Sequence, residues 1–169
     1  DLGVLVVRFA SPAAAPPVEW RRLEPWTRTR AVTVADVRAP VAGGALEVAL
    51  LADLVVLRPG ATLELPGSAE LPSAGLLWAL GRAGRAALAV GLLMPSRLEP
   101  ARAVELGLAQ AVLAPDEPVP IPGSASVTAL TAARDLARAE MSGSAGLGLE
   151  RAMFRFLFAA GDPEEGARA

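Results

Sequence analysis

Two adjacent glycines, Gly43 and Gly44, place the tightest constraint on what this chain can fold into. They stand directly before an apolar helical run, Ala45 to Ala52, whose single acid is Glu47. Because neither glycine carries a Cβ, the backbone of this turn can closely approach a neighbouring chain or a ligand. The helix that follows presents free N–H groups and the positive end of its dipole at the same place. The stretch therefore predicts a turn suited to an anion, or to an oxygen that becomes anionic during a reaction.

Glu47 lies on the first turn of the predicted helix, so it is the candidate proton-transfer group for the same ligand. Simpler interpretations stand beside the functional ones. The glycines alone can form a structural turn that needs a positive φ, and an acid in a first helical turn is stabilised by the dipole. The apolar neighbours of Glu47, which would partly bury it, favour a functional role. Asp53, directly after the helix, is interpreted as a structural cap rather than a catalyst.

The residue types that are missing exclude several kinds of chemistry. The chain has no His, Cys or Tyr, and every basic residue is arginine. Zinc sites of the ordinary type, Ser-His-Asp catalysis and thiol chemistry are therefore excluded, and no metal or disulfide is expected. The net charge of -2 gives no electrostatic reason to expect nucleic acid. The apolar runs are too short for a membrane span, and the first residues lack a basic leader, so the expected location is the cytoplasm.

Hydrophobic periodicity and proline positions predict the remaining elements. Apolar and alternating runs indicate strands, whereas the proline-rich run from Ala10 to Val18 is expected to be irregular. The segment from Glu19 to Arg28 has Trp20, Leu23 and Trp26 at helical spacing; an amphipathic helix packed on the core is favoured over a lid above a nucleotide. The expected strands are Gly3 to Phe9, Ala31 to Val37, Leu54 to Leu57, Ala61 to Pro66 and Ala109 to Leu113; the expected helices are Ser73 to Leu80, Ala83 to Met94 with a break at Gly81, Pro100 to Leu106 ended by Gly107, Ser124 to Met141 and Leu149 to Ala160.

Four motifs in order resemble the crotonase family of enoyl-CoA hydratases and isomerases. The first is the glycine pair with a glutamate three residues after Gly44, followed by an apolar helix that ends in Asp53. The others are the run ATLELP at residues 61–66, the run GRAGRAALAVGLLMPSRLEPARAVELGLAQAVL at 81–113, and the tail LERAMFRFLFAAGDPEEGARA at 149–169. The resemblance covers residues 31–169.

The resemblance implies an α/β fold with a crotonase-like (ClpP/crotonase) core, C-terminal helices and an abbreviated N-terminal half. Residues 1–120 would form the core, and residues 121–169 would form a helical region of the same domain that takes part in oligomers. Met153, Phe154 and Phe158 of that region would contact either a neighbouring subunit or their own domain. The Gly44 N–H would polarise a thioester carbonyl, Gly43 would contact the substrate, and Glu47 would move a proton.

The sequence also departs from the family pattern at two places. Only 42 residues precede the glycine turn, where the family has a longer stack of strand–strand–helix units. The second catalytic glutamate of family hydratases corresponds to Gly67, and neither Glu64 nor Glu70 matches that position. With one matched glutamate, double-bond isomerisation or a related enolate reaction is easier to support than hydration.

Two functions therefore follow from the resemblance. The first is an acyl-CoA lyase or isomerase, as in fatty acid metabolism, which stabilises a thioester enolate. The second is a catalytically degenerate subunit or helper of another acyl-CoA or polyketide-type enzyme. The expected partner is an acyl-CoA thioester, with coenzyme A as part of the substrate and no separate cofactor. A homotrimer or hexamer is expected, alone or with a homologous subunit. Arg82, Arg85 and Arg97 are candidates for contacts to CoA phosphates, although solvated surface positions are the simpler interpretation.

Overall fold

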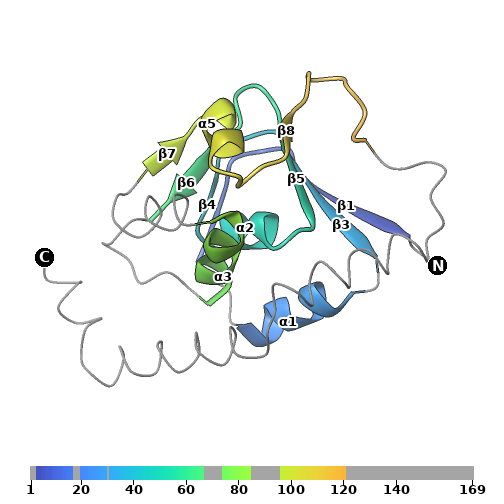
Figure 1. The fold of residues 1–169 in the computed structure, drawn as a ribbon, viewed down its shortest axis with the longest axis vertical. Coiled ribbons are helices and arrows are strands. Elements are labelled where there is room, and N and C mark those ends of the chain that lie inside the picture. The colour runs from blue at the N-terminus through green and yellow to red at the C-terminus, as the bar shows by residue number, and fades with distance from the viewer. Residues whose placement is uncertain (1–2, 17–19, 30, 67–73, 85–95, 121–169) are drawn as a thin grey trace, which may run out of the picture.

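Three successive strand–strand–helix units build most of the chain that the computed structural model describes, which is residues 3–16, 20–29, 31–66, 74–84 and 96–120 (Figure 1). The units are followed by a strand, a helix and a last strand. The elements are β1 (Val4–Phe9), β2 (Ala13–Ala15), α1 (Trp20–Arg28), β3 (Val32–Val37), β4 (Val41–Ala42), α2 (Gly43–Leu50), β5 (Leu54–Leu57), β6 (Leu63–Leu65), α3 (Ala74–Ala83), β7 (Ser96–Leu98), α5 (Pro100–Glu105) and β8 (Ala111–Val112). The predicted α/β class is confirmed.

The repeated course of the units produces two sheets. The first strands of the units and β8 form a parallel sheet in the order β1-β3-β5-β8, which we call the first sheet. The second strands and β7 form the second sheet, β2-β4-β6-β7, in which only the β6–β7 pair is antiparallel. Each unit thus stacks on the preceding one through both of its strands, as in repeat architectures.

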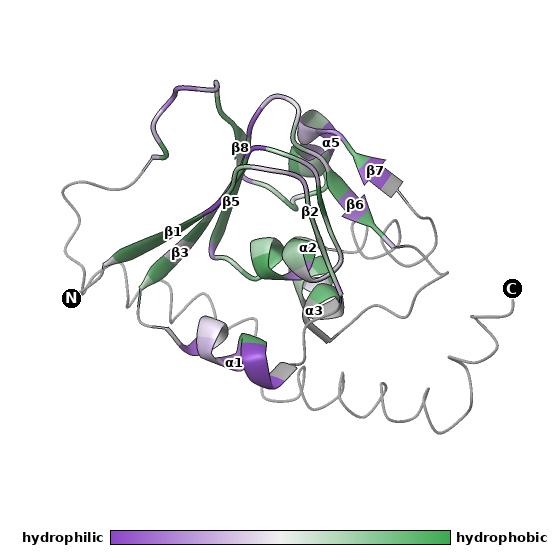
Figure 2. Cartoon of the chain, turned by 180° about the vertical axis from the view of Figure 1, so that it is seen from behind, coloured by the Kyte–Doolittle hydropathy of each residue, from purple (hydrophilic) through white to green (hydrophobic). Residues whose placement is uncertain are grey.

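The main hydrophobic core lies between the two sheets, where α2 and α3 are also found (Figures 1 and 2). Side chains alternate across a strand, so Ala35 and Val37 point to one face of the first sheet and Val34 to the other. Ala35 and Val37 pack in the main core with Leu46 of α2, which is fully buried. Val34 belongs to a smaller cluster on the opposite face, together with Val56 and Leu113. The two polar regions described below, one at α2 and one around Asp36, therefore lie on opposite faces of the first sheet.

The helix α1 is amphipathic, as the sequence indicated. Its Leu23 is buried, whereas Arg21 and Arg22 are exposed, and Figure 2 shows that most of the helix is hydrophilic. The indole N–H of Trp26 is buried without a hydrogen-bond partner. The burial of Leu23 supports the interpretation that this helix packs on the core.

Several predicted boundaries are wrong. Ala13–Ala15 forms β2 within a segment expected to be irregular, because backbone pairing with β4 outweighs the flanking prolines. The helix α2 begins at Gly43 instead of Ala45, and α3 continues through Gly81 to Ala83. An isolated glycine in a helix costs only about 1 kcal/mol relative to alanine, so packing can override it. The strands β4 and β7 were not predicted.

Gly107 ends α5, as predicted. It has a φ of 76° and donates its N–H to the Val104 carbonyl at 2.9 Å, while the Leu108 N–H donates to the Ala103 carbonyl at 2.9 Å. These two bonds make a Schellman cap, which requires a left-handed residue that glycine adopts without strain. The cap turns the chain directly into β8.

The remaining sequence predictions lie outside the described residues. They are the helix from Ala83 to Met94 beyond residue 84, the helices after residue 121, and the positions of Gly67, Glu70 and Arg85. The division of the chain at residue 120 therefore stays a prediction, as does the proposed role of the C-terminal region in oligomers.

Candidate functional site

The glycine turn lies where β4 runs directly into α2. Gly43 is the first residue of the helix and has a φ of 53°, a left-handed value that non-glycine residues rarely adopt. A Cβ on Gly43 would stand 2.1 Å from the Ala15 carbonyl oxygen. Both the conformation and the close approach of β2 therefore require glycine at this position.

The N-terminus of α2 has no side-chain cap. Ala42 occupies the N-cap position with an extended backbone and makes no capping hydrogen bond, and the first turn holds no acid. The N–H groups of a first helical turn lack partners within the helix, so they are donors for whatever lies in front of them. Gly44, which supplies one of these N–H groups, is buried.

Glu47 is the fifth residue of α2, so the prediction that it lies on the first turn is wrong. The helix begins two residues earlier than expected because the glycines themselves are helical. Glu47 and Gly44 are three residues apart and so lie on the same face of the helix. Both are buried, and Glu47 is only 2% exposed. A buried carboxylate is costly unless its charge is paired or its oxygens are hydrogen-bonded, so its presence in an otherwise apolar helix calls for a structural or functional reason.

Ala15 is a neighbour of the turn that the sequence did not reveal. It forms an isolated parallel β-bridge with Gly43. Each hydrogen bond of such a bridge joins an N–H of one strand to a carbonyl of the other. Because Pro16 has no N–H, the donors of this bridge must be the N–H of Ala15 and an N–H of the turn that contains Gly43. The Ala15 carbonyl is thus an acceptor placed directly against the glycine turn.

Asp53 holds the start of β3, which agrees with the structural role predicted for it, although the C-cap of α2 is Leu51 and not Asp53. Its Oδ2 accepts hydrogen bonds from the N–H and the hydroxyl of Thr33, both at 2.8 Å, and the Asp53 N–H donates to the Thr33 hydroxyl oxygen at 3.0 Å. A pocket of about 110 Å³ beside it is lined in part by Leu50 and Gln110, and therefore lies at the C-terminal end of α2. This pocket is at the opposite end of the helix from the glycine turn.

The other predicted polar residues lie on the second sheet, where Glu64 of β6 pairs in register with Ala42, the residue directly before the glycine turn. Glu64 is half-buried on β6 and is paired across the second sheet with Arg97 of β7. The Arg97 side chain is 62% exposed and its Nε lies 3.8 Å from the Glu99 carboxylate. This agrees with the simpler interpretation of Arg97 as a solvated surface residue. Within the described ranges, no group of three acidic residues is arranged to hold a metal ion, and no helix is both long and apolar enough to cross a bilayer.

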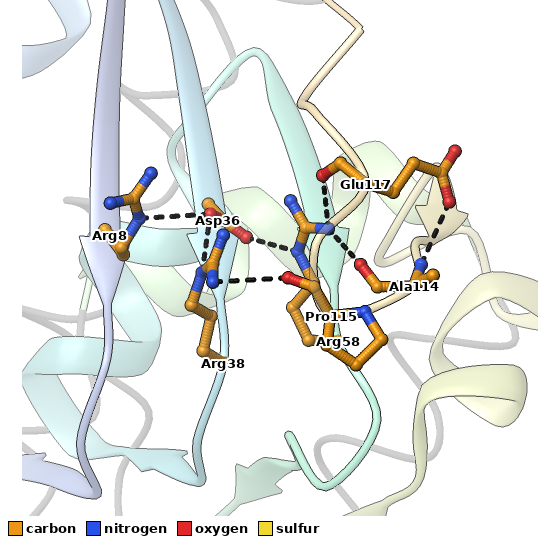
Figure 3. A network of polar contacts seen from close by, with 7 residues as sticks. All are labelled: Arg8, Asp36, Arg38, Arg58, Ala114, Pro115 and Glu117. Carbon is orange, nitrogen blue, oxygen red and sulfur yellow. Dashed lines mark hydrogen bonds and ion pairs between the residues drawn. The ribbon is translucent and has the colours of Figure 1, made fainter.

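A second polar region, which we call the Asp36 cluster, gathers Arg8, Arg38 and Arg58 around one carboxylate (Figure 3). Asp36 Oδ1 accepts from Arg58 Nε at 2.8 Å; Oδ2 accepts from Arg38 Nε at 2.9 Å and from Arg8 Nε at 3.3 Å. Burial by itself raises the pKa of Asp36, but the hydrogen bonds and positive charges of Arg58 and Arg38 outweigh it and hold that pKa below its ordinary value. The carboxylate therefore stays ionised in the folded protein.

The Asp36 cluster also fixes the loop after β8. Arg58 Nη1 donates to the Ala114 and Glu117 carbonyls, the latter at 2.7 Å, and Arg38 Nη1 donates to the Pro115 carbonyl at 3.4 Å. The sequence contained a signal for this cluster, because an acid at an inward position of the apolar run VTVADV is unusual. Only the pairing of β1, β3 and β5 shows that three arginines surround it.

Comparison with known proteins shows what the arrangement resembles. No family model and no curated protein matches the sequence. Solved structures do match. An enoyl-CoA hydratase from Mycobacterium avium subsp. paratuberculosis K-10 has a TM-score of 0.68 and 24% identity, and the match covers 88% of this chain and 67% of that protein.

Two further structures illustrate the range of neighbours. An enoyl-CoA hydratase/isomerase from Marinobacter aquaeolei has a TM-score of 0.58 and 21% identity over 82% of this chain and 56% of its own. A methylmalonyl CoA decarboxylase complexed with 2S-carboxypropyl CoA has a TM-score of 0.67 and 18% identity over 88% of this chain and 62% of its own. The chain thus spans between 56% and 67% of the length of these three proteins. At these identities the similarity establishes the fold.

Proposed function

We propose, from the premise that the chain has the crotonase fold shared by these structures, that it acts on an acyl thioester and stabilises its enolate. The fold predicted from the sequence is thereby confirmed, and the activity is our proposal. The observation that carries it is the pairing, on one buried face of α2, of an uncapped glycine N-terminus with the carboxylate of Glu47.

In this proposal the Gly44 N–H donates a hydrogen bond to the thioester oxygen as it becomes anionic. A preorganised donor in a buried site strengthens as the negative charge develops, which lowers the barrier to enolate formation. Glu47 removes or returns the proton on the carbon next to the thioester carbonyl, and the burial of its carboxylate favours this transfer because burial raises the proton affinity of a carboxylate. Gly43 would contact the acyl group through its backbone, because the Ala15 carbonyl already lies where a side chain of Gly43 would stand.

The reaction class follows from the number of carboxylates available. One carboxylate that moves a proton between two carbons suffices for double-bond isomerisation or α-proton exchange, whereas hydration also needs a group that positions water. Glu64 pairs with Ala42 beside the turn, but it alternates on β6 with Leu63 and Leu65, which pack in the main core with α2, so its side chain points to the other face of the second sheet. Isomerisation or a related enolate reaction is therefore the proposed chemistry, with coenzyme A as part of the substrate.

The proposal includes a trimeric or hexameric assembly in the cytoplasm. Light scattering after size-exclusion chromatography tests the oligomeric state.

The test of this proposal is α-proton exchange of butyryl-CoA in deuterated buffer, followed by NMR, because exchange reports enolate formation directly. We expect the wild-type chain to catalyse exchange, and Glu47→Gln to lose about 10²- to 10⁴-fold of that rate. Glu64→Gln is the matched control, since it removes a carboxylate from β6 whose side chain points away from the main core and α2, and it should retain the wild-type rate. If the wild-type protein gave no faster exchange than buffer alone, the proposed enzymatic activity would be excluded.

A second candidate, a catalytically degenerate crotonase-fold subunit, is favoured by the Ala15–Gly43 bridge. The Ala15 carbonyl is an acceptor at the glycine turn, so it competes with a thioester oxygen for the same N–H groups. If the bridge persists in solution, the Ala15 carbonyl occupies the donors of the turn and no thioester oxygen can bind there. In this candidate the fold serves assembly with another enzyme instead of catalysis. Absence of both exchange and butyryl-CoA binding, with a folded protein, would favour this candidate.

A further inference from the structure

The Asp36 cluster lies on the face of the first sheet that is turned away from α2. Asp36 alternates with Ala35 and Val37, which pack in the main core with α2, and shares its face with Val34 of the smaller cluster. Arg58 likewise follows Val56 on that face. Gly44 and Glu47 belong to α2, so the Asp36 cluster is separate from the proposed acyl site.

The charges of the cluster do not balance. Three guanidinium groups converge on the single carboxylate of Asp36, which leaves two positive charges in excess. Glu117 is nearby but exposed, and its carboxylate accepts a hydrogen bond from the Ala114 N–H at 2.9 Å. The Asp36 side chain is fully buried and that of Arg58 is 3% exposed, whereas the side chains of Arg38 and Arg8 are 32% and 58% exposed. Water therefore reaches the excess charge from the side of Arg8 and Arg38 and screens it in part.

The hydrogen-bond donors of the cluster also outnumber its acceptors. Arg38 and Arg8 share the single oxygen Oδ2 of Asp36, and both reach it through Nε. Arg58 Nη2 is buried and has no hydrogen-bond partner, although Nε and Nη1 of the same group are bonded. A buried donor without a partner costs about 1–3 kcal/mol, and more when it is charged. The cluster therefore lacks acceptor oxygens and negative charge at the same place.

We propose that the Asp36 cluster binds a phosphate group through Arg8, Arg38 and Arg58. A phosphate offers several acceptor oxygens and carries between one and two negative charges near neutral pH, which matches both deficits. Planar guanidinium groups donate in pairs to such oxygens, and this geometry favours arginine over other cations. The Arg8 side chain is 58% exposed, so the cluster is open to solvent on the side of β1.

Isothermal titration calorimetry of the 169-residue chain with inorganic phosphate tests the proposal, with chloride at equal ionic strength as the reference. Arg8→Gln and Arg38→Gln are the informative variants because both side chains are partly exposed, and circular dichroism checks that each remains folded. Arg102→Gln is the matched control, since that arginine pairs with Glu105 on α5 and its side chain is 56% exposed. We expect each cluster variant to weaken phosphate binding about tenfold or more, and the control to bind as the wild type does.

Phenyl phosphate, titrated in parallel, distinguishes the two sources of the phosphate group. Tighter binding of the ester supports an organic phosphate as the ligand, and equal or tighter binding of inorganic phosphate supports the free ion. Absence of heat with both ligands, or an equal loss in Arg102→Gln, would overturn the proposal. Glu47→Gln should bind phosphate normally, so this proposal and the acyl-thioester proposal fail independently.

Discussion

Replacement of Gly43 by alanine tests the contact on which the glycine turn depends. The φ of 53° costs an alanine about 1–2 kcal/mol because its Cβ approaches the carbonyl oxygen of the same chain segment. The new Cβ would also stand 2.1 Å from the Ala15 carbonyl oxygen, far inside contact distance. To relieve this overlap, β2 must move away from α2 and the bridge must break, which adds about 1–3 kcal/mol. We therefore expect Gly43→Ala to lower the free energy of unfolding by about 2–5 kcal/mol.

Gly60→Ala is the matched control for this substitution. Gly60 also has a positive φ, 86°, but a Cβ there would meet nothing within 4 Å. Its expected cost is the conformational part alone, about 1–2 kcal/mol. The difference between the two variants isolates the steric effect of the Ala15 carbonyl.

Urea denaturation followed by tryptophan fluorescence measures both variants. With a slope near 2 kcal/mol per molar urea, a difference of about 2 kcal/mol between Gly43→Ala and Gly60→Ala separates their midpoints by about 1 M. Equal midpoints would refute the reasoning, because they would mean that β2 does not lie against the glycine turn in solution. In that case the Ala15 carbonyl would not compete for the turn, and the argument for a degenerate site would lose its basis.

Four further predictions concern stability and use the same urea denaturation. Asp36→Asn should lower the free energy of unfolding by about 3–5 kcal/mol because Arg58 stays buried without its counter-charge, whereas Glu105→Gln on an exposed pair should cost less than about 1 kcal/mol. Because the pKa of Asp36 is lowered in the folded protein, its contribution to the free energy of unfolding is complete above the ordinary carboxyl pKa of about 4 and is lost as the pH falls through the folded pKa. If the stability of the wild type and of Asp36→Asn fell in the same way with decreasing pH, this prediction would be contradicted. Gly81→Ala should raise the free energy of unfolding by about 0.4–1 kcal/mol, since Gly81 lies within α3 with open space around its Cβ, and a loss of stability would contradict this. Thr33→Val should lower it by about 1–3 kcal/mol, because the Asp53 carboxylate loses a hydroxyl donor in a part-buried position, and an unchanged midpoint would show that this bond is not significant.

The elements with a strong local pattern were predicted correctly. The apolar runs gave β1, β3 and β5 within a residue or two, and Gly107 ended α5 because only a left-handed residue completes that cap. The order of the four motifs led to the crotonase fold, which the solved structures confirm. These features depend on residues that are close in sequence, so the sequence alone can indicate them.

The candidate site was predicted only in part, for a physical reason. The three residues Gly43, Gly44 and Glu47 were identified from spacing, and the burial of Glu47 agrees with its apolar neighbours. Their assignment as substrate, oxyanion and proton-transfer groups stays a prediction. The start of α2 was misplaced because the propensity of glycine disfavours a helix, and tertiary packing overrode it. The strand β2 was missed because its pairing with β4 joins segments about 28 residues apart, which no local pattern reports.

The sequence by itself determined the strands β1, β3 and β5, the glycine turn and the absence of histidine and cysteine chemistry. Only the tertiary structure decided what lies against that turn and what surrounds Asp36. The Ala15 carbonyl reaches Gly43 because parallel stacking brings the first unit beside the second, and the same stacking aligns Arg8 with Asp36 across two strands. Register between distant strands is set by the packing of whole sheet faces, so it cannot be read from the segments taken one at a time.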